Sequence, residues 1–364
     1  MAGCAGRPNM RGIRIASTGT YLPGPNLDQD SVRALLRRYN DGLTHEQQDK
    51  LLQSTGIQGR HFGLDPDPPY QHETNTSMAV KAASVALDRA GWQANDIDLL
   101  VVTTIVPDQL IPPTSTLVQE ALGIERCAEL EISANCTAPY KGLQAAADAI
   151  RLGRARKVLL CSVQISSVFG WPPWANSEAD RLSGAIRWIV SDGAAAVTLE
   201  ASDSEDCELR VWTESTGAGK SPGMELPLGT ANLDIRSGFA AGTQHVTQND
   251  DTVVLESMAI AFDAATRLED ALDIRYTDVE HFILPLASVE LRDALMGPIE
   301  EKFGIRPDTL RSNVDRIGYI GGVSALIMLD ELSTSGELKP GERVLGFAIE
   351  SSKWMCAAAT MIWR

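Results

Sequence analysis

The sequence predicts an α/β fold built from two similar halves. Short, nearly continuous apolar runs alternate with longer segments whose apolar residues recur at helical spacing. The same strand-then-helix order returns in the second part of the chain, although the two parts share no visible sequence identity. We therefore expect a duplicated layered architecture, with an N-terminal half of residues 1–200 and a C-terminal half of residues 201–364.

The first half begins with a strand and then alternates. The run at 98–104, Asp-Leu-Leu-Val-Val-Thr-Thr, is almost wholly apolar and too short for a helix, which favours a parallel strand buried on both faces. The helix at 77–90 has apolar residues at helical spacing, with Thr76 as its expected N-cap. In chain order we expect a strand at 13–20, the helix at 77–90, a strand at 98–104, a helix at 115–122, a strand at 128–132, a helix at 141–152 and strands at 158–162 and 194–199.

The second half repeats this order. We expect a strand at 207–213, a helix at 254–272, a strand at 281–285, helices at 289–303 and 323–333, and closing strands at 343–349 and 355–363. Two segments break the pattern. Residues 170–188 hold three tryptophans and two prolines, and residues 217–251 are polar and rich in glycine, so we expect loops in both.

Composition excludes several classes of function. With 48 acidic and 32 basic residues, the formal charge of −16 argues against partners such as nucleic acid or an anionic membrane surface. The six cysteines form no C-x-x-C pair, which favours a reducing cytoplasm and argues against a structural zinc. No stretch reaches the roughly 18 apolar residues of a membrane span. We therefore expect a cytoplasmic protein that needs no metal and no cofactor.

The most informative residue is Cys136, which lies between an expected strand and an expected helix. Near a helix N-terminus, unpaired backbone N–H groups and the helix dipole stabilise a thiolate and lower its pKa. Such a cysteine is poised as a nucleophile. A buried cysteine packed as a small apolar residue is the alternative, and the local pattern leaves both interpretations open.

Several segments occur in the order and spacing of one known family. They are Gly19-Thr-Tyr-Leu-Pro23, Ser54-Thr-Gly-Ile57 followed by Arg60, Thr103-Thr-Ile-Val-Pro-Asp108 followed by Pro112-Pro-Thr-Ser115, the segment around Cys136, Ser191-Asp-Gly-Ala-Ala195 and Asn313-Val-Asp-Arg316-Ile-Gly318. From about Arg11 to Arg364, the chain resembles the β-ketoacyl-[acyl carrier protein] synthase III enzymes. The resemblance implies a thiolase-like fold with layered α-β-α-β-α halves, a homodimer, and an acyl carrier protein or coenzyme A thioester as partner.

Members of that family use a cysteine, a histidine and an asparagine, and here only the cysteine remains. Leu286 stands at the histidine position and Tyr319 at the asparagine position. The family uses those two groups to stabilise the enolate formed when a malonyl unit loses carbon dioxide. Losing one oxyanion-type donor typically costs about 3 to 4 kcal/mol, so the resemblance implies that ordinary decarboxylative condensation is severely impaired.

Acyl loading of the cysteine depends on other groups. The resemblance implies that the backbone amides of Cys136 and Ser352 meet the developing oxyanion, although Ser351-Ser352 stands where the family is rich in glycine. Tyr319 has two interpretations, a hydrogen-bond donor to an oxyanion or a filler of volume beside Leu286, and both stay open. His281 precedes Leu286 by five residues, and we expect it to lie away from the nucleophile.

Recognition of the acyl donor also departs from the family. Coenzyme A users hold the adenine between a tryptophan and an arginine, and this chain has Lys50 and Ser54 there; Ser167 replaces a further arginine. The loss of these groups favours a donor bound to a carrier protein. A docking patch could draw on Lys50, Arg37, Arg38 and Arg60, and a solvated charged face is the alternative.

The expected function is therefore an acyltransferase of specialised metabolism. It would load an acyl group from a carrier-protein or coenzyme A thioester onto Cys136. A small-molecule hydroxyl, amine or thiol would then accept that group without decarboxylation. Two alternatives remain, a synthase III-type condensing enzyme that forms a C–C bond and a non-catalytic partner subunit of an active synthase.

Overall fold

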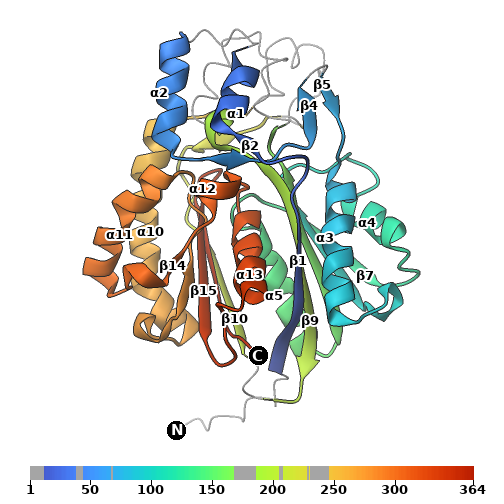
Figure 1. Ribbon diagram of the computed structural model, residues 1–364. Helices are drawn as coiled ribbons and strands as arrows, with labels where there is room; N and C mark the ends of the chain where they lie inside the picture. Colours follow the sequence, from blue (N-terminus) through green and yellow to red (C-terminus); the bar gives the residue numbers. More distant parts are fainter. Residues whose placement is uncertain are drawn as a thin grey trace.

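The chain folds around two five-stranded sheets that lie face to face, with helices between them and outside them (Figure 1). The computed structural model describes residues 12–37, 44–66, 69–167, 186–204, 208–227, 229 and 246–364. Within this part of the chain, no helix combines the length and apolar character needed to cross a membrane.

The first sheet collects strands from the first part of the chain. Its spatial order is β1 (Gly12–Tyr21), β9 (Asp192–Ser202), β8 (Lys157–Ile165), β6 (Leu99–Thr104) and β7 (Ala128–Ser133). β1, β9 and β8 pair antiparallel, and β8, β6 and β7 pair parallel. β7 therefore forms one edge of this sheet.

The second sheet repeats that pattern. Its order is β10 (Leu209–Ser215), β16 (Met355–Ile362), β15 (Arg343–Glu350), β13 (His281–Ile283) and β14 (Leu310–Arg311). Again the first two pairings are antiparallel and the last two are parallel. The expected α/β fold with duplicated halves is confirmed by this correspondence. The division at residue 200 stays a prediction, because α13 (Val323–Ser335), from the second half, packs on β1 and β9 of the first.

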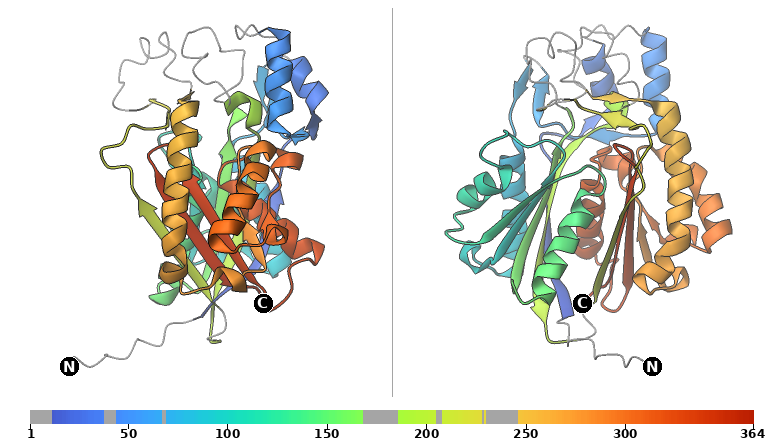
Figure 2. Two further views of the ribbon diagram at one scale, coloured as in Figure 1. Left: turned by 90° about the vertical axis from the view of Figure 1, so that its left-hand side faces the viewer. Right: turned by 180° about the vertical axis from the view of Figure 1, so that it is seen from behind.

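Helices complete five layers, which the two further views separate (Figure 2). α5 (Ala138–Arg151) and α13 lie between the sheets, and their apolar residues belong to one central core cluster. α3 (Asn75–Ala90) and α4 (Thr114–Leu122) cover the outer face of the first sheet. α10 (Asp250–Leu272) and α11 (Val289–Phe303) cover the second sheet.

β6 shows how the apolar runs produce this layering. All six of its residues are buried. Because successive side chains of a strand point to opposite faces, Val101 enters the central cluster while Leu100 and Val102 pack against α3. A strand covered on both faces therefore has no polar side, which is why its sequence does not alternate.

Smaller elements cap one end of the layers. They are β2 (Leu27–Asp28), α1 (Gln29–Leu36), α2 (His45–Thr55), β3 (Gly59–Arg60), β4 (Leu64–Pro66), β5 (Pro69–Gln71), α8 (Ile186–Ile189), β11 (Met224–Glu225), β12 (Thr247–Gln248) and α12 (Val314–Ile317). Short 3-10 turns occur at Ala94–Asp96, Tyr276–Asp278 and Pro307–Thr309.

Most predicted elements occur within a few residues of their expected positions, and α11 has the predicted bounds. α3 is capped by Thr74 rather than by Thr76, since the Thr74 hydroxyl accepts from the backbone N–H of Ser77 at 3.0 Å. α5 begins at Ala138, three residues earlier than expected. α1 and α2 were not predicted. Of the two expected loops, residues 168–185 of the first and residues 228 and 230–245 of the second lie outside the described residues; α8, β11 and β12 occupy part of the remainder.

Close packing of α3 on β1 depends on Gly19. A Cβ atom on Gly19 would lie 2.5 Å from the carbonyl oxygen of Ala82 and 2.6 Å from the amide nitrogen of Ala86. Both are backbone atoms of α3, so a side chain at this position would force the helix away from the strand.

We predict that Gly19→Ala destabilises the protein by about 1 to 3 kcal/mol, the usual cost of overpacking a well-filled core. Urea unfolding followed by circular dichroism measures this free energy. The control is Gly297→Ala in α11, where an added Cβ has no neighbour within 4 Å. Alanine there should leave stability equal or higher, since glycine weakens a helix interior. Equal stabilities of the Gly19 variant and the wild type would contradict the packing argument.

Candidate active site

Cys136 lies where the first sheet passes into the central layer. It follows β7 and precedes Thr137, the residue that caps α5 at its N-terminus. Its side chain is 5% exposed. The expected strand-to-helix junction is therefore present, with the thiol enclosed rather than at the surface.

The second half of the chain reaches the same point through the N-terminus of α13. A Cβ on Gly322 would lie 2.3 Å from the carbonyl oxygen of Cys136 and 2.7 Å from Cδ of Pro139. Only a residue without a side chain permits this approach. The ends of α5 and α13 are thus in direct backbone contact beside the sulfur.

Tyr319 is the hydrogen-bond partner of the thiol. It lies in the connection between α12 and α13, and its hydroxyl is 2.8 Å from Sγ of Cys136. Backbone hydrogen bonds hold it in place, because its N–H donates to Ile189 at 2.9 Å and its carbonyl accepts from Ser191 at 3.0 Å. Either the phenol or the thiol can donate in this hydrogen bond, and the role of Tyr319 in any reaction stays a prediction.

A buried carboxylate completes the site. Glu350 ends β15 and is 2% exposed. Its Oε2 accepts hydrogen bonds from the backbone N–H of Thr137, at 3.1 Å, and from the Thr137 hydroxyl, while its Oε1 accepts from the Ser352 hydroxyl at 2.6 Å. The N-terminus of α5 is therefore already bound to an anion.

The electrostatics of Cys136 differ from the expectation of a lowered pKa. Burial and the nearby charge of Glu350 raise the pKa of the thiol to about 12, and the hydrogen bond from Tyr319 offsets only part of this effect. The helix terminus does not favour a thiolate here because the carboxylate occupies it. Burial and the Cys136 sulfur also raise the pKa of Tyr319, so both groups are neutral at physiological pH.

Two buried polar atoms next to this group have no hydrogen-bond partner. They are the hydroxyl of Tyr140, one turn into α5, and Oδ1 of Asn135. Buried polar atoms are normally satisfied, so these two are exceptions among the described residues. The described residues contain no cluster of three His, Cys, Asp or Glu side chains suited to a metal ion.

The other residues singled out from the sequence are dispersed. Ser352 lies in the turn between β15 and β16 and reaches the site through its hydroxyl on Glu350. Its expected role as a backbone amide donor stays a prediction. Leu286 is 8% exposed but packs in the cluster between the second sheet and α10, apart from the central cluster that holds Cys136.

The expected donor-binding residues lie on another element. Lys50 and Ser54 are exposed, one turn apart on α2. The docking patch was wrong for Arg60, which is fully buried and donates to the carbonyl of Trp188. Desolvation lowers the pKa of its guanidinium to about 10. Arg37 pairs with Asp49, and Arg38 lies outside the described residues.

His281, which we expected to lie away from the nucleophile, and Ser167, which replaces an arginine of the resembled family, have other partners. His281 is buried at the start of β13, with Nε2 3.1 Å from Oε2 of Glu342. Ser167 binds Asp192, its N–H donating to Oδ1 at 2.8 Å. Burial raises the pKa of Asp192 to about 6, although N–H groups of Gly63 and Ser167 oppose the shift.

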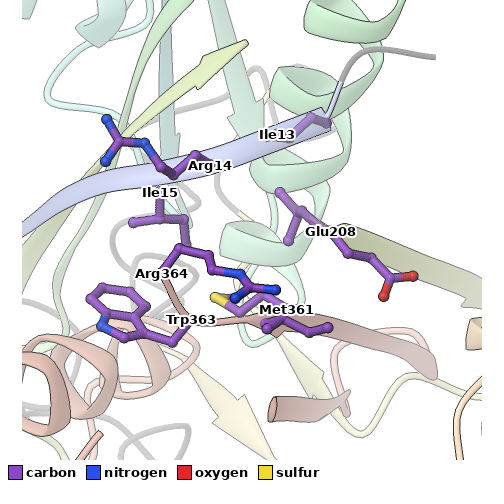
Figure 3. Close-up of a pocket in the computed structure, with 9 residues that line it drawn as sticks. Ile13, Arg14, Ile15, Glu208, Met361, Trp363 and Arg364 are labelled. Atoms are coloured by element: carbon purple, nitrogen blue, oxygen red, sulfur yellow. The ribbon is translucent and has the colours of Figure 1, made fainter. Parts of the chain in front are cut away.

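A small hollow lies at the far end of α5, where β1, β10 and β16 meet (Figure 3). Ile13, Glu208 and Met361 line it. Leu209, which also lines it, accepts a hydrogen bond from Arg151, the last residue of α5. With a rise of about 1.5 Å per residue, the length of α5 separates this hollow from Cys136 by about 20 Å, so the hollow is not part of the site.

Comparison with known proteins shows which family the chain is similar to. Family models for 3-oxoacyl-[acyl-carrier-protein] synthase III match residues 130–217 and, for its C-terminal part, residues 269–360. A β-ketoacyl-[acyl-carrier-protein] synthase III of Clostridium perfringens is 24% identical over 344 residues, 92% of this chain and 95% of its own length.

Two solved structures have the same fold. A tetronic acid condensing enzyme, AbyA1, superimposes with a TM-score of 0.78 at 24% identity, covering 96% of this chain and 99% of its own. A glutamate-to-glutamine variant of Xanthomonas campestris OleA gives a TM-score of 0.79 at 20% identity, covering 99% and 100%. The chain thus has the fold of these two proteins. In sequence it is a synthase III-like protein of the thiolase superfamily.

Sequence reasoning missed Glu350, Thr137 and Tyr140. Glu350 had a detectable signal, because it directly precedes Ser351-Ser352, where the resembled family is rich in glycine. A carboxylate among residues expected to be small indicates a changed site. Thr137 and Tyr140 carried no such signal, since their roles depend on where β15 meets α5.

We predict that the thiolate of Cys136 is scarce at neutral pH and depends on Tyr319. Alkylation of Cys136 by iodoacetamide should rise about tenfold per pH unit between about pH 7 and pH 10, without a plateau, because the pKa lies above that range. Tyr319→Phe removes a hydrogen bond to the charged form, so its alkylation should be at least about tenfold slower at any given pH.

Peptide mass spectrometry of the alkylated protein measures these rates at Cys136, and Cys161, also buried, is the internal control. A plateau below about pH 9 in the wild type, or equal rates in the two proteins, would contradict this assignment.

Proposed function

We propose that the protein is an acyltransferase that loads an acyl group onto Cys136 and passes it to an acceptor without decarboxylation. The donor is a thioester of an acyl carrier protein or of coenzyme A. The acceptor is a hydroxyl, amine or thiol of a small molecule. The supporting observation is the Tyr319 hydroxyl 2.8 Å from Sγ, at a position where the resembled family has a carboxamide.

Decarboxylative condensation and simple acyl transfer need different groups around the sulfur of Cys136. Decarboxylative condensation needs two donors that converge on the carbonyl of a second thioester, whereas Leu286 has no donor and the Tyr319 hydroxyl is directed at Cys136. Acyl transfer needs a nucleophile and donors for one oxyanion. We expect the backbone amides of Cys136 and Ser352 to supply the donors for that requirement.

A condensing enzyme that forms a C–C bond is the second candidate. It is favoured by the relatives, one of which is named a tetronic acid condensing enzyme. In that case Tyr319 or a carboxylate would replace the enolate-stabilising pair. A non-catalytic partner subunit is disfavoured by the thiol–phenol contact, which a purely structural role does not require.

Acyl loading should be visible as a covalent adduct. After incubation with a panel of acyl-coenzyme A and acyl-carrier-protein thioesters, we expect intact-protein mass to rise by one acyl group at Cys136, and Cys136→Ala to remain unmodified. Adding an amine or alcohol should release an amide or ester without carbon dioxide. Absence of an adduct with every donor would refute the proposal, and a β-keto product with release of carbon dioxide would support the condensing enzyme.

We also propose a homodimer in the cytoplasm. The edge strand β7 has an exposed Leu130, and the loop after β6 exposes Leu110 and Ile111 at 82% and 86%. An uncovered strand edge with exposed apolar side chains favours pairing with a second copy. The four described cysteines are free thiols, as a reducing compartment requires.

Light scattering after size-exclusion chromatography should give about 78 kDa, twice the 39.2 kDa of the chain. Leu130→Arg places a charge on the β7 edge and should shift the mass towards one chain. Leu152→Arg, at a leucine at the end of α5 that is 68% exposed against 44% for Leu130, should leave the mass unchanged. A wild-type mass of one chain would contradict the dimer.

A further inference from the structure

Trp354 has an unusual backbone conformation for a residue with a large side chain. Its φ is 59°, in the left-handed region that residues other than glycine rarely adopt. Among the described residues other than glycine, only Asp273, at the C-terminal cap of α10, shares this feature. Trp354 is also fully buried. A bulky residue keeps such a conformation only where its surroundings hold it there.

The strained residue is the last of the turn, residues 351–354, that connects β15 to β16. The Ser352 hydroxyl donates to Glu350 at 2.6 Å. Glu350 in turn accepts at 3.1 Å from the backbone N–H of Thr137, the residue that follows Cys136. Two successive hydrogen bonds therefore connect this turn to the backbone beside the nucleophile.

The loop at 216–223 holds Trp354 in its conformation. The indole N–H donates to the carbonyl of Ser221 at 2.6 Å. The carbonyl of Trp354 accepts twice from Thr216, from its N–H at 2.9 Å and from its hydroxyl at 3.0 Å. These three hydrogen bonds fix both the ring and the peptide group of the strained residue.

The same loop packs directly against the rest of the turn. Gly223 donates its N–H to the carbonyl of Ser351 at 3.0 Å. A Cβ on Gly217 would lie 1.9 Å from the carbonyl oxygen of Lys353, and one on Gly223 would lie 2.9 Å from the ring of Trp354. Only glycine permits this approach. The loop thus contacts the turn on both sides of Ser352.

We propose that Trp354 is a positioning residue, which holds the turn so that the backbone N–H of Ser352 meets the oxyanion formed when Cys136 attacks an acyl thioester. This inference rests on the proposed function. In that step the S–C bond to Cys136 forms and the S–C bond of the donor breaks. The thiol proton leaves with the departing sulfur, and Ser352 only donates a hydrogen bond.

The left-handed residue has a physical role in this arrangement. It sets the direction in which the chain leaves the turn, and therefore the orientation of the N–H groups before it. A glycine would adopt this conformation and several others, whereas the bound indole of Trp354 permits one. A donor that is already oriented stabilises an oxyanion without reorganisation during the reaction.

Trp354→Phe keeps a buried ring and removes the N–H that binds Ser221. The saturating rate constant for acylation of Cys136 should fall at least about tenfold, while the thioester concentration at half the maximal rate stays within about twofold. The oxyanion exists only in the transition state, which is why binding is spared. Alkylation of Cys136 by iodoacetamide should match the wild type, because displacement of iodide creates no oxyanion.

Gly217→Ala tests the same contact from the loop. Its Cβ would push the carbonyl of Lys353 and displace the turn, so acylation should become at least about 100-fold slower with alkylation unchanged. The matched control is Gly219→Asn in the same loop. An added Cβ there has no neighbour within 4 Å, and asparagine tolerates its φ of 75°. Both rates of this control should equal those of the wild type.

Trp92→Phe is the control for removing a buried indole, since Trp92 lies in the cluster outside the first sheet. Its rates should also equal those of the wild type. Mass spectrometry measures both reactions at Cys136, and thermal unfolding checks the fold of each variant. If Trp354→Phe is unfolded, Thr216→Val replaces it. That change removes one of the three hydrogen bonds, and acylation should become at least about threefold slower.

Acylation at the wild-type rate in any of these three variants overturns the inference. An equal loss of acylation and alkylation also overturns it, because the nucleophile itself would then be disturbed. Failure of the proposed function gives a different result, since no thioester would then acylate the wild-type protein. In that case the inference fails with it, whereas in the first two cases the wild type still carries the acyl adduct.

Discussion

The site depends on one backbone contact between the two halves of the chain. Gly322, at the start of α13, lies against the carbonyl of Cys136, at the start of α5, and no side chain fits between them. This contact carries Tyr319 to the sulfur and fixes both central helices between the sheets. Because of this contact, Cys136 and Tyr319 lie within hydrogen-bond distance of each other although they are 183 positions apart in sequence.

The chemistry of Cys136 and Tyr319 follows from their burial. A thiol in water ionises near neutral pH with modest help, but Cys136 is surrounded by apolar residues, two phenols and a carboxylate. Burial and the carboxylate disfavour a negative charge on the sulfur, and the hydrogen bond with Tyr319 offsets only part of that effect. The imidazole and carboxamide of the resembled family are therefore absent, and a buried carboxylate, Glu350, is present instead. The site has gained a charged group as well as lost two polar ones.

Much of the fold was predictable because its signals are local. The run at 98–104 reads as a buried strand without reference to any other segment, and β6 has those residues in its core. Cys136 could be located for the same reason. The role of Glu350 could not, since it arises only where the end of β15 meets the cap of α5, 213 residues apart. The buried state of Arg60 was missed because a charged residue in a polar segment predicts exposure.

The repeated strand order has an electrical consequence. Because the two halves share one topology, the central helices begin at the same place, and their amino-terminal ends face a common point. The positive ends of two helix dipoles thus lie beside the backbone of Cys136, one from each half of the chain. Duplication of the fold in this way brings main-chain positive potential to the cysteine from two directions.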